Sequence, residues 1–329
     1  MTARLFSFKA GIVAASFASA CSGESTTTGL DEPIRVADAQ FKEGPLPGFP
    51  APPRGTENPK LVKPTVNGAT LPPVANVGEA DFAIPGRASS DAFAVGAKLG
   101  GFGSGYWLVP VGSADGTNPG DYGFTMKMDF SKDVPSGTQT LTFVAFDANG
   151  KPGTQFTNEL CIAPAVPDNL NACVATQVPP YLVVSLDWDA LVDLDLRVIT
   201  PAGKTVDAKH PTTAQPNEDG KTDPNAPGEG ILRPDSNAGC VIDGLNRENL
   251  VFKDKPAPGT YYVYANLFDA CGKPSVRFNV SLHKSRVTSN EDPKKYTVDE
   301  TYRTSSSLLA VHANGGAKNG LFVTEFEVK

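Results

Sequence analysis

The clearest pattern of hydrophobic and polar positions in this chain runs from Val183 to Val206. Apolar and polar residues alternate there with a period of two, pass a short acidic corner, alternate again and reach a Pro-Ala-Gly turn. Because successive side chains of a β-strand point to opposite faces, the stretch predicts two adjacent antiparallel strands in a half-buried sheet. It also carries four aspartates: Asp187, Asp189, Asp193 and Asp195.

Similar short alternating runs, bounded by turn residues, recur along the chain, and no long helical periodicity accompanies them. The sequence therefore predicts an all-β fold of two β-sandwich domains in tandem. The first, over residues 77–158, is expected to be immunoglobulin-like, with six or seven short strands. The second covers residues 181–329 and contains a long loop at 207–239. The expected strands are 81–84, 92–98, 106–111, 122–130 and 140–146, then 181–188, 193–199, 260–267, 275–282, 296–303, 306–312 and 320–328.

Two further segments carry few apolar residues in regular order. Residues 22–76 are rich in proline, which keeps a chain extended, so they are expected to form a disordered tether. Residues 159–180 hold Cys161, Cys173 and a Pro-Pro pair, which suggests a connector between the domains.

The first 21 residues have the composition of a targeting segment. Arg4 and Lys9 give a basic start, an apolar run covers 10–18, and small residues precede Cys21. This predicts a bacterial lipoprotein signal peptide, with Cys21 acylated as the mature N-terminus; an ordinary secretory leader is the alternative. Ser22 provides no aspartate retention signal, so an outer-membrane anchor is expected, facing either the periplasm or the surface.

Removing Cys21 leaves four cysteines, an even number that in an oxidising compartment suggests two disulfides. Three connectivities exist. The local one is preferred because each bridge then stays within one part of the chain; it joins Cys161 to Cys173 and Cys240 to Cys271.

The net charge of −7 and the lack of a Lys/Arg cluster make nucleic acid a poor candidate partner. The expected partners are a membrane, through the lipid anchor, and an envelope protein or a glycan. The nucleophile-elbow, zincin and P-loop patterns are missing from the sequence, so the protein is expected not to be an enzyme.

Asp193 and Asp195 share one face of a predicted strand, where like charges repel unless a cation or hydrogen bonds compensate them. One hypothesis is a Ca²⁺ site built from Asp193, Asp195, Asp235 and Asn237, since calcium binds six or more oxygen ligands. The alternative is structural: the carboxylates accept hydrogen bonds from backbone amides and hold the loop at Asp235. No other cofactor is expected.

Tyr262 and Tyr264 share one face of a later predicted strand. They are expected either to pack into the core or to form an exposed aromatic platform on which a sugar could stack.

Four motifs occur in order over about 100 residues. They are LDWDALVDLDLRVITPAGKTV from Leu186, DSNAGC from Asp235, NRENL from Asn246 and PGTYYVYANLFDACG from Pro258. Together they resemble the bacterial YfaP-like β-sandwich domain, found in secreted and envelope proteins. The resemblance covers about 181–285 and implies a β-sandwich without a defined activity. Arg197 and Arg247 replace the usual histidine and proline of that pattern.

These observations favour a lipid-anchored envelope protein that acts as a non-catalytic binding or structural interaction module. One alternative is an accessory lipoprotein that binds carbohydrate or peptide for a secreted enzyme. A second is a hydrolase that uses paired carboxylates of the acidic corner.

Overall fold

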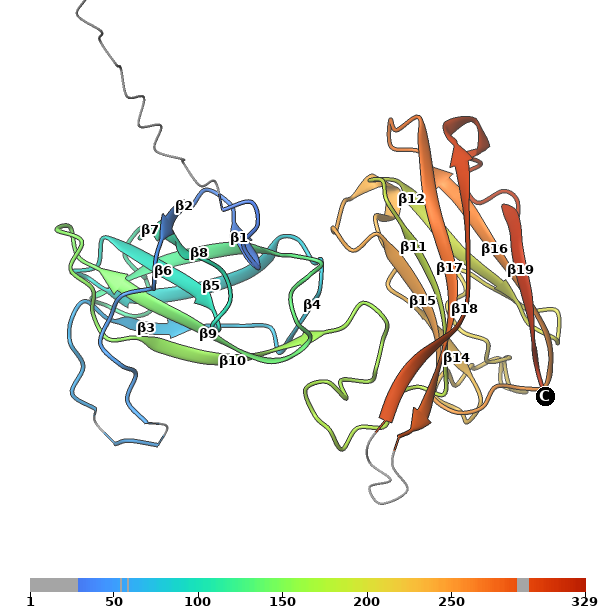
Figure 1. Cartoon of the computed structure of the whole chain (residues 1–329), viewed down its shortest axis with the longest axis horizontal. Coiled ribbons are helices and arrows are strands. Elements are labelled where there is room, and N and C mark those ends of the chain that lie inside the picture. Colours follow the sequence, from blue (N-terminus) through green and yellow to red (C-terminus); the bar gives the residue numbers. More distant parts are fainter. Residues whose placement is uncertain (1–28, 54, 58, 289–295) are drawn as a thin grey trace, which may run out of the picture.

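The computed structural model describes residues 29–53, 55–57, 59–288 and 296–329, and Cys21 with its predicted signal peptide lies outside them. The described chain consists of strands β1–β19 and two short 3₁₀ helices, which confirms the predicted all-β fold. Figure 1 shows two sandwiches, the first coloured blue to green and the second yellow to red. Each has a hydrophobic core of its own.

The first sandwich packs a sheet of order β1-β8-β5-β3 against a sheet of order β2-β7-β6-β9-β10-β4. Its strands pair antiparallel except for β4 and β10, which are parallel. The strands are β1 (Ile34–Val36), β2 (Gln40–Glu43), β3 (Val66–Ala69), β4 (Val74–Asn76), β5 (Phe82–Ser89), β6 (Ala94–Leu99), β7 (Gly105–Pro110), β8 (Asp121–Phe130), β9 (Gly137–Phe146) and β10 (Phe156–Ala163).

Alternation along β8 explains this core. Phe124, Met126, Met128 and Phe130 all point inward and are buried, while the residues between them face outward. Burying such side chains contributes about 1.5 to 3 kcal/mol each, before the entropy cost of ordering the chain.

The prediction of a disordered tether over 22–76 is wrong for its described part. Strands β1–β4 lie within that range and complete both sheets of the first sandwich (Figure 1). Ile34 and Val66 are buried in the core, and the indole Nε1 of Trp107 donates a hydrogen bond to the Ile34 carbonyl at 2.7 Å. Strands of three or four residues are too short to show a period of two, and the prolines stand in the connections between them.

Residues 159–180 are also only partly a connector. Strand β10 continues to Ala163 and pairs with β9 and β4, so Cys161 belongs to the first sandwich. Its disulfide to Cys173 fastens the following loop to that strand, with the two Cα atoms 5.8 Å apart. The second expected disulfide, between Cys240 and Cys271, is present as well.

The second sandwich packs a sheet of order β14-β15-β11-β17-β18 against a sheet of order β13-β12-β16-β19. Its elements are β11 (Leu182–Trp188), β12 (Asp193–Ile199), β13 (Thr205–Val206), β14 (Gly230–Arg233), η1 (Ala238–Cys240), β15 (Arg247–Phe252), β16 (Gly259–Asp269), β17 (Ser275–Val287), β18 (Tyr296–Leu309), η2 (Ala310–His312) and β19 (Leu321–Val328).

The prediction that β11 and β12 are adjacent strands of one sheet is wrong. β11 pairs with β15 and β17, whereas β12 pairs with β13 and β16. The acidic corner between them carries the chain across the sandwich. Both strands direct leucine and valine side chains into the shared core from opposite sides.

Three further elements differ from the expectation. β14 lies inside the predicted long loop, and β15 is a strand although it begins with the polar residues Arg247, Glu248 and Asn249. All three are buried, so polarity concealed this strand from the hydrophobic pattern. The strand expected at 306–312 is instead the end of β18 followed by η2.

Direct polar contacts join the two sandwiches within the described part of the chain. Arg247 of β15 donates from Nη1 to the Val77 carbonyl at 3.0 Å, and the Ala80 amide donates to the Asp243 carbonyl at 3.1 Å. Within the described residues, no helix has the length and apolar character needed to span a membrane.

Candidate functional site

The acidic corner leads into β12, whose two faces are both covered. Leu194, Leu196 and Val198 point into the core, and Asp193 and Asp195 lie on the other face. The register shifts between Asp193 and Leu194, so β12 begins with a bulge. Bulges re-aim side chains at the end of a strand, and this one stands where the carboxylates gather.

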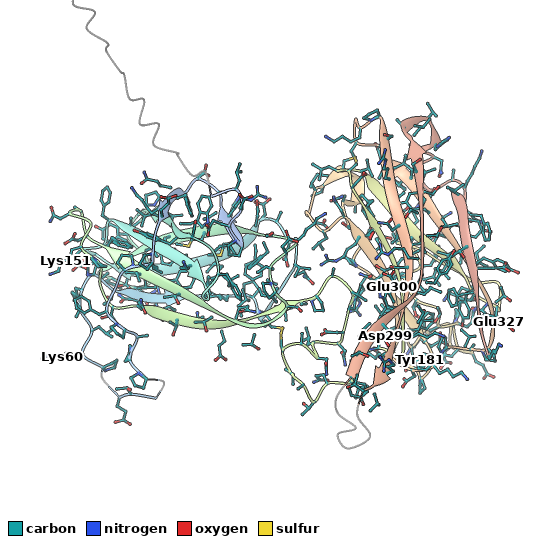
Figure 2. The ribbon with its side chains drawn as sticks, viewed as in Figure 1. Lys60, Lys151, Tyr181, Asp299, Glu300 and Glu327 are labelled. Carbon is teal, nitrogen blue, oxygen red and sulfur yellow. A yellow bond between two sulfur atoms is a disulfide. The ribbon has the colours of Figure 1, made fainter. Side chains whose placement is uncertain are left out.

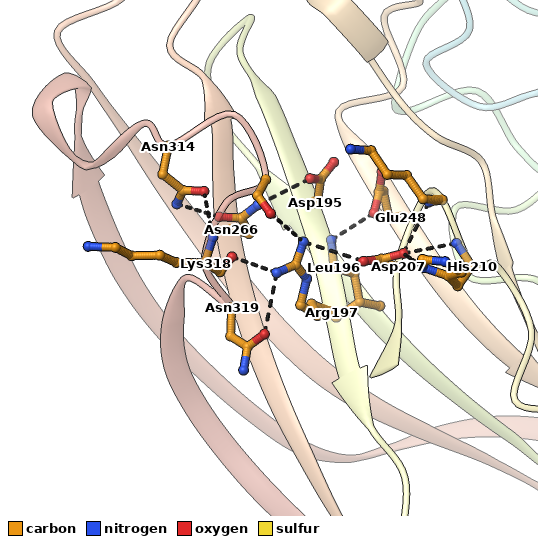
Figure 3. Close-up of polar contacts among 12 residues, drawn as sticks. Asp195, Leu196, Arg197, Asp207, His210, Glu248, Asn266, Asn314, Lys318 and Asn319 are labelled. Carbon is orange, nitrogen blue, oxygen red and sulfur yellow. Dashed lines mark hydrogen bonds and ion pairs between the residues drawn. The ribbon is translucent and has the colours of Figure 1, made fainter. Parts of the chain in front are cut away.

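Loops cover the outer face of β12, so Asp193 is only 3% exposed and Asp195 only 5%. One loop runs from Asp235 into η1, and its Gly239 N–H donates to Oδ2 of Asp193 at 2.7 Å. Asp195 Oδ2 accepts a hydrogen bond from Asn266 Nδ2 of β16 at 3.3 Å. Figure 3 shows the polar contacts of Asp195 and its neighbours on β12.

Three carboxylates converge at this corner. Asp193, Asp195 and Asp235 each place one oxygen so that all three atoms lie within 4.8 Å of one another. A cavity of about 170 Å³ opens over them. It is large enough for an ion with several waters and smaller than the roughly 300 to 1,000 Å³ of usual small-molecule pockets.

Burial and mutual repulsion disfavour the charged forms of these groups. Burial, assisted by the charges of Asp235 and Asp269, raises the pKa of Asp193 to about 6. Burial, followed by the charges of Asp193 and Asp235, raises the pKa of Asp195 to about 7. The pKa of Asp235 is raised too, by desolvation and by the charge of Asp243. The corner therefore favours the binding of positive charge, whether protons or a cation.

A fourth carboxyl, Glu248, lies fully buried behind β12. Its Oε2 accepts a hydrogen bond from the Leu196 amide at 2.7 Å, while Oε1 has no hydrogen-bond partner among the described residues. Burial and then the charge of Asp195 hold the pKa of Glu248 well above its usual range. This buried oxygen without a partner lies beside the three aspartates, so it is a further group that positive charge or a hydrogen-bond donor would stabilise.

Arg197, which also lines the cavity, does not supply the missing positive charge, because it is already engaged. Its Nη2 lies 3.4 Å from Oδ2 of Asp207, and its Nη1 donates to the Lys318 carbonyl at 2.5 Å. Figure 3 shows Arg197 between Asp207 on one side and the loop with Lys318 and Asn319 on the other. Arg197 therefore fastens two loops to β12.

Asn237, expected among the calcium ligands, forms hydrogen bonds with Val192, Asn246 and Asp243. Its Nδ2 donates to the Val192 carbonyl at 3.0 Å and to Oδ1 of Asn246 at 2.9 Å, and its Oδ1 accepts the Asp243 amide at 3.1 Å. These bonds hold a left-handed residue with φ of 60° at the start of η1. Asn237 therefore positions the Asp235 loop through contacts outside the carboxylate cluster.

Sequence reasoning had not assigned Glu248 or Asp207 to this corner. Glu248 belongs to the NRENL segment, but that segment alone does not show that the Glu248 side chain is buried. Its burial follows from the position of β15 as an interior strand between β11 and β14. Cys240, Cys271 and Asp269 also lie close together, but both thiols are bound in a disulfide and cannot ligate a metal as thiolates.

The two tyrosines lie on the outer face of β16. Tyr262 is 40% exposed and Tyr264 is partly buried, whereas the intervening Tyr261 and Val263 enter the core. Phe322 of β19 completes the group, with ring centroids 5.5 Å from Tyr264 and 6.5 Å from Tyr262. Core packing is therefore not the role of this pair.

No family model matches the sequence, and no curated protein matches it. Among solved structures, the chain is similar to a tetra-tandem repeat from the extending region of a large adhesion protein, with 11% identity and a TM-score of 0.20. That likeness covers 74% of this chain and 65% of the other. The C-terminal domain of the Streptococcus agalactiae AgI/II polypeptide BspA gives 8% identity and a TM-score of 0.20, covering 70% and 94%. Neither likeness bears on function, and the resemblance to YfaP-like domains stays a prediction.

The raised pKa values predict a stability that depends on pH when no divalent cation is present. Folded Asp193 and Asp195 keep protons up to about pH 6 and 7, whereas the unfolded chain releases them near pH 4. The free energy of unfolding of the second sandwich should therefore fall between pH 4 and 7, by on the order of 3 kcal/mol. Urea titrations in EDTA measure it.

Asp195→Asn resembles the protonated side chain, so it should flatten this pH dependence. Asp219→Asn, in an exposed part of the long loop, should leave it unchanged. A wild-type stability that rises from pH 4 to 7, with the same slope in Asp195→Asn, would contradict the assignment.

Proposed function

We propose that this protein is a non-catalytic module of a bacterial cell envelope whose second sandwich is stabilised by a divalent cation. The convergence of the Asp193, Asp195 and Asp235 carboxylates within 4.8 Å carries the proposal. Two of them belong to β12 and the third to the loop before η1, so a cation between them would clasp that loop to the sheet. The clasp is structural, since Asp193 and Asp195 are too deeply buried to reach a polymeric substrate.

Calcium fits this donor set best among common cations. All three side chains offer hard carboxylate oxygens, which calcium and magnesium prefer over the softer nitrogen and sulfur ligands chosen by zinc. Calcium also accepts irregular coordination completed by waters and carbonyl oxygens, for which the cavity over the carboxylates has room. The competing arrangement is a corner held by shared protons and hydrogen bonds alone.

Calcium should raise the melting temperature of the second sandwich. Ligand at one hundred times its dissociation constant stabilises a fold by about 2.7 kcal/mol, which corresponds to a rise of roughly 5 to 10 °C for a domain of this size. Titration calorimetry and thermal unfolding, with CaCl₂ against EDTA at pH 7.5, measure it. The effect should shrink at pH 5, where protons occupy Asp193 and Asp195.

Asp235→Asn tests the site with little risk to folding, because Asp235 is exposed. It should abolish most of the calcium effect, whereas Asp219→Asn should preserve it. If the wild-type chain shows no heat of calcium binding and no shift in melting temperature with calcium, the site is not a calcium site. The arrangement held by shared protons and hydrogen bonds then remains.

The proposal includes the lipid anchor at Cys21, which lies outside the described residues. Several acyl chains on one residue would hold the protein on the outer membrane. The wild-type chain should therefore appear in the membrane fraction of the cell and Cys21→Ser in the soluble fraction. Equal distribution of the two would rule the anchor out.

A second candidate function is saccharide binding at the aromatic face of β16 and β19. Exposed rings stack on the apolar faces of sugar rings, and Tyr262 and Phe322 are 40% and 49% exposed. The Phe322 ring lies near both Tyr262 and Tyr264, so the three rings can form one continuous platform. This function would suit an accessory protein that holds an enzyme near envelope glycans.

Loss of one ring of the platform should weaken such binding. Tyr262→Ala removes one stacking contact. It should lower the affinity for saccharides identified on a glycan array by about tenfold. Tyr302→Ala is the matched control, because Tyr302 is also 40% exposed but lies on β18. No saccharide on the array, or equal loss in both variants, would eliminate this candidate.

A further inference from the structure

A second cavity, unrelated to the acidic corner, lies between the two sandwiches. It encloses about 770 Å³ and is lined by Val77 and Lys132 of the first sandwich, and by residues at the ends of β11, β15, β17 and β18 of the second. Small-molecule sites commonly occupy domain interfaces and have volumes of about 300 to 1,000 Å³. The cleft therefore has the position and size of a ligand site.

The acidic groups of this cleft are already satisfied by protein partners. Asp187 accepts a hydrogen bond from Asn279 Nδ2 at 2.7 Å and lies 3.8 Å from Arg303. Asp189 Oδ1 accepts the backbone amide of Arg277 at 2.9 Å. Each of these carboxylates therefore has a hydrogen-bond donor from the protein.

Of the basic residues that line the cleft, Arg247 donates to the Val77 carbonyl, whereas Lys132 and Arg277 are not satisfied in the same way. Among the described residues, the side chains of Lys132 and Arg277 form neither an ion pair nor a hydrogen bond, and both are exposed. Lys132 comes from the first sandwich and Arg277 from the second. The cleft therefore presents one available positive charge from each domain.

Uncharged polar groups line the space between them. Ser305, Ser306 and Ser307 follow one another on β18, and Ser305 Oγ donates to Asn279 Oδ1 at 2.7 Å. Trp188 also lines the cleft, and its indole Nε1 is buried without an acceptor among the described residues. Hydroxyl, amide and indole groups of this kind bind ligands rich in hydroxyls.

We propose that the cleft binds an acidic saccharide, a chain of sugar rings that carry carboxylates. The carboxylates would pair with Lys132 and Arg277, and the sugar hydroxyls would exchange hydrogen bonds with the serines and Asn279. A phosphate or a single carboxylate would leave most of the 770 Å³ to water, whereas two or three sugar rings would fill it. The ligand contacts both sandwiches and so fixes their mutual orientation.

Titration calorimetry of the full chain with trigalacturonate tests the proposal, in EDTA so that no cation occupies the acidic corner. Trigalacturonate should bind, and the neutral trisaccharide maltotriose should bind at least about tenfold more weakly, because charge-assisted hydrogen bonds are the stronger ones. Lys132→Gln and Arg277→Gln should each weaken trigalacturonate by about tenfold. Lys151→Gln, at the far end of the first sandwich (Figure 2), should not change it.

Three results would overturn the proposal. They are the absence of heat with trigalacturonate, equal affinity for maltotriose, and unchanged affinity in both cleft variants. Inorganic phosphate that competes as tightly as trigalacturonate would mark an anion site and would equally exclude the saccharide. Because EDTA is present, none of these results depends on the calcium clasp.

Discussion

The stability of the second sandwich depends on how the buried carboxylates of Asp193 and Asp195 are neutralised. Asp193 and Asp195 lie on a strand whose opposite face builds the core, so they cannot turn to solvent without removing Leu194 and Leu196 from that core. Each unpaired carboxylate in such surroundings costs several kcal/mol unless it is protonated or paired with positive charge. The Gly239 amide of η1 and the Asn266 side chain of β16 supply two hydrogen bonds, which do not compensate the charge of two carboxylates.

Strand β15 connects this corner to the rest of the molecule. Glu248 holds the backbone of β12 at Leu196, and the neighbouring Arg247 reaches the first sandwich at Val77. Arg197 and Arg247 therefore both form contacts between segments. One joins the loops around β12, and the other joins the domains.

The sequence predicted what regular alternation encodes. Strands such as β8 and β12 followed from local patterns, and both disulfides join the cysteines that the preference for local pairing selected. Asp193, Asp195 and Asp235 do lie together, but the calcium hypothesis that grouped them stays a prediction. Pairing between distant strands is not encoded locally, so the assignment of β11 and β12 to one sheet failed. Polar burial is invisible to a hydrophobic pattern, so β15 and Glu248 were missed, and the short strands β1–β4 were hidden among prolines.

The entry of β1 into the first sandwich limits how far the protein can stand from a membrane. Because β1 begins at Ile34, only about a dozen residues separate Cys21 from the first sheet. A chain of that length spans at most roughly 45 Å when fully extended. If Cys21 bears the proposed anchor, the start of β1 stays within that distance of the bilayer. A partner would then have to approach the membrane to contact β1.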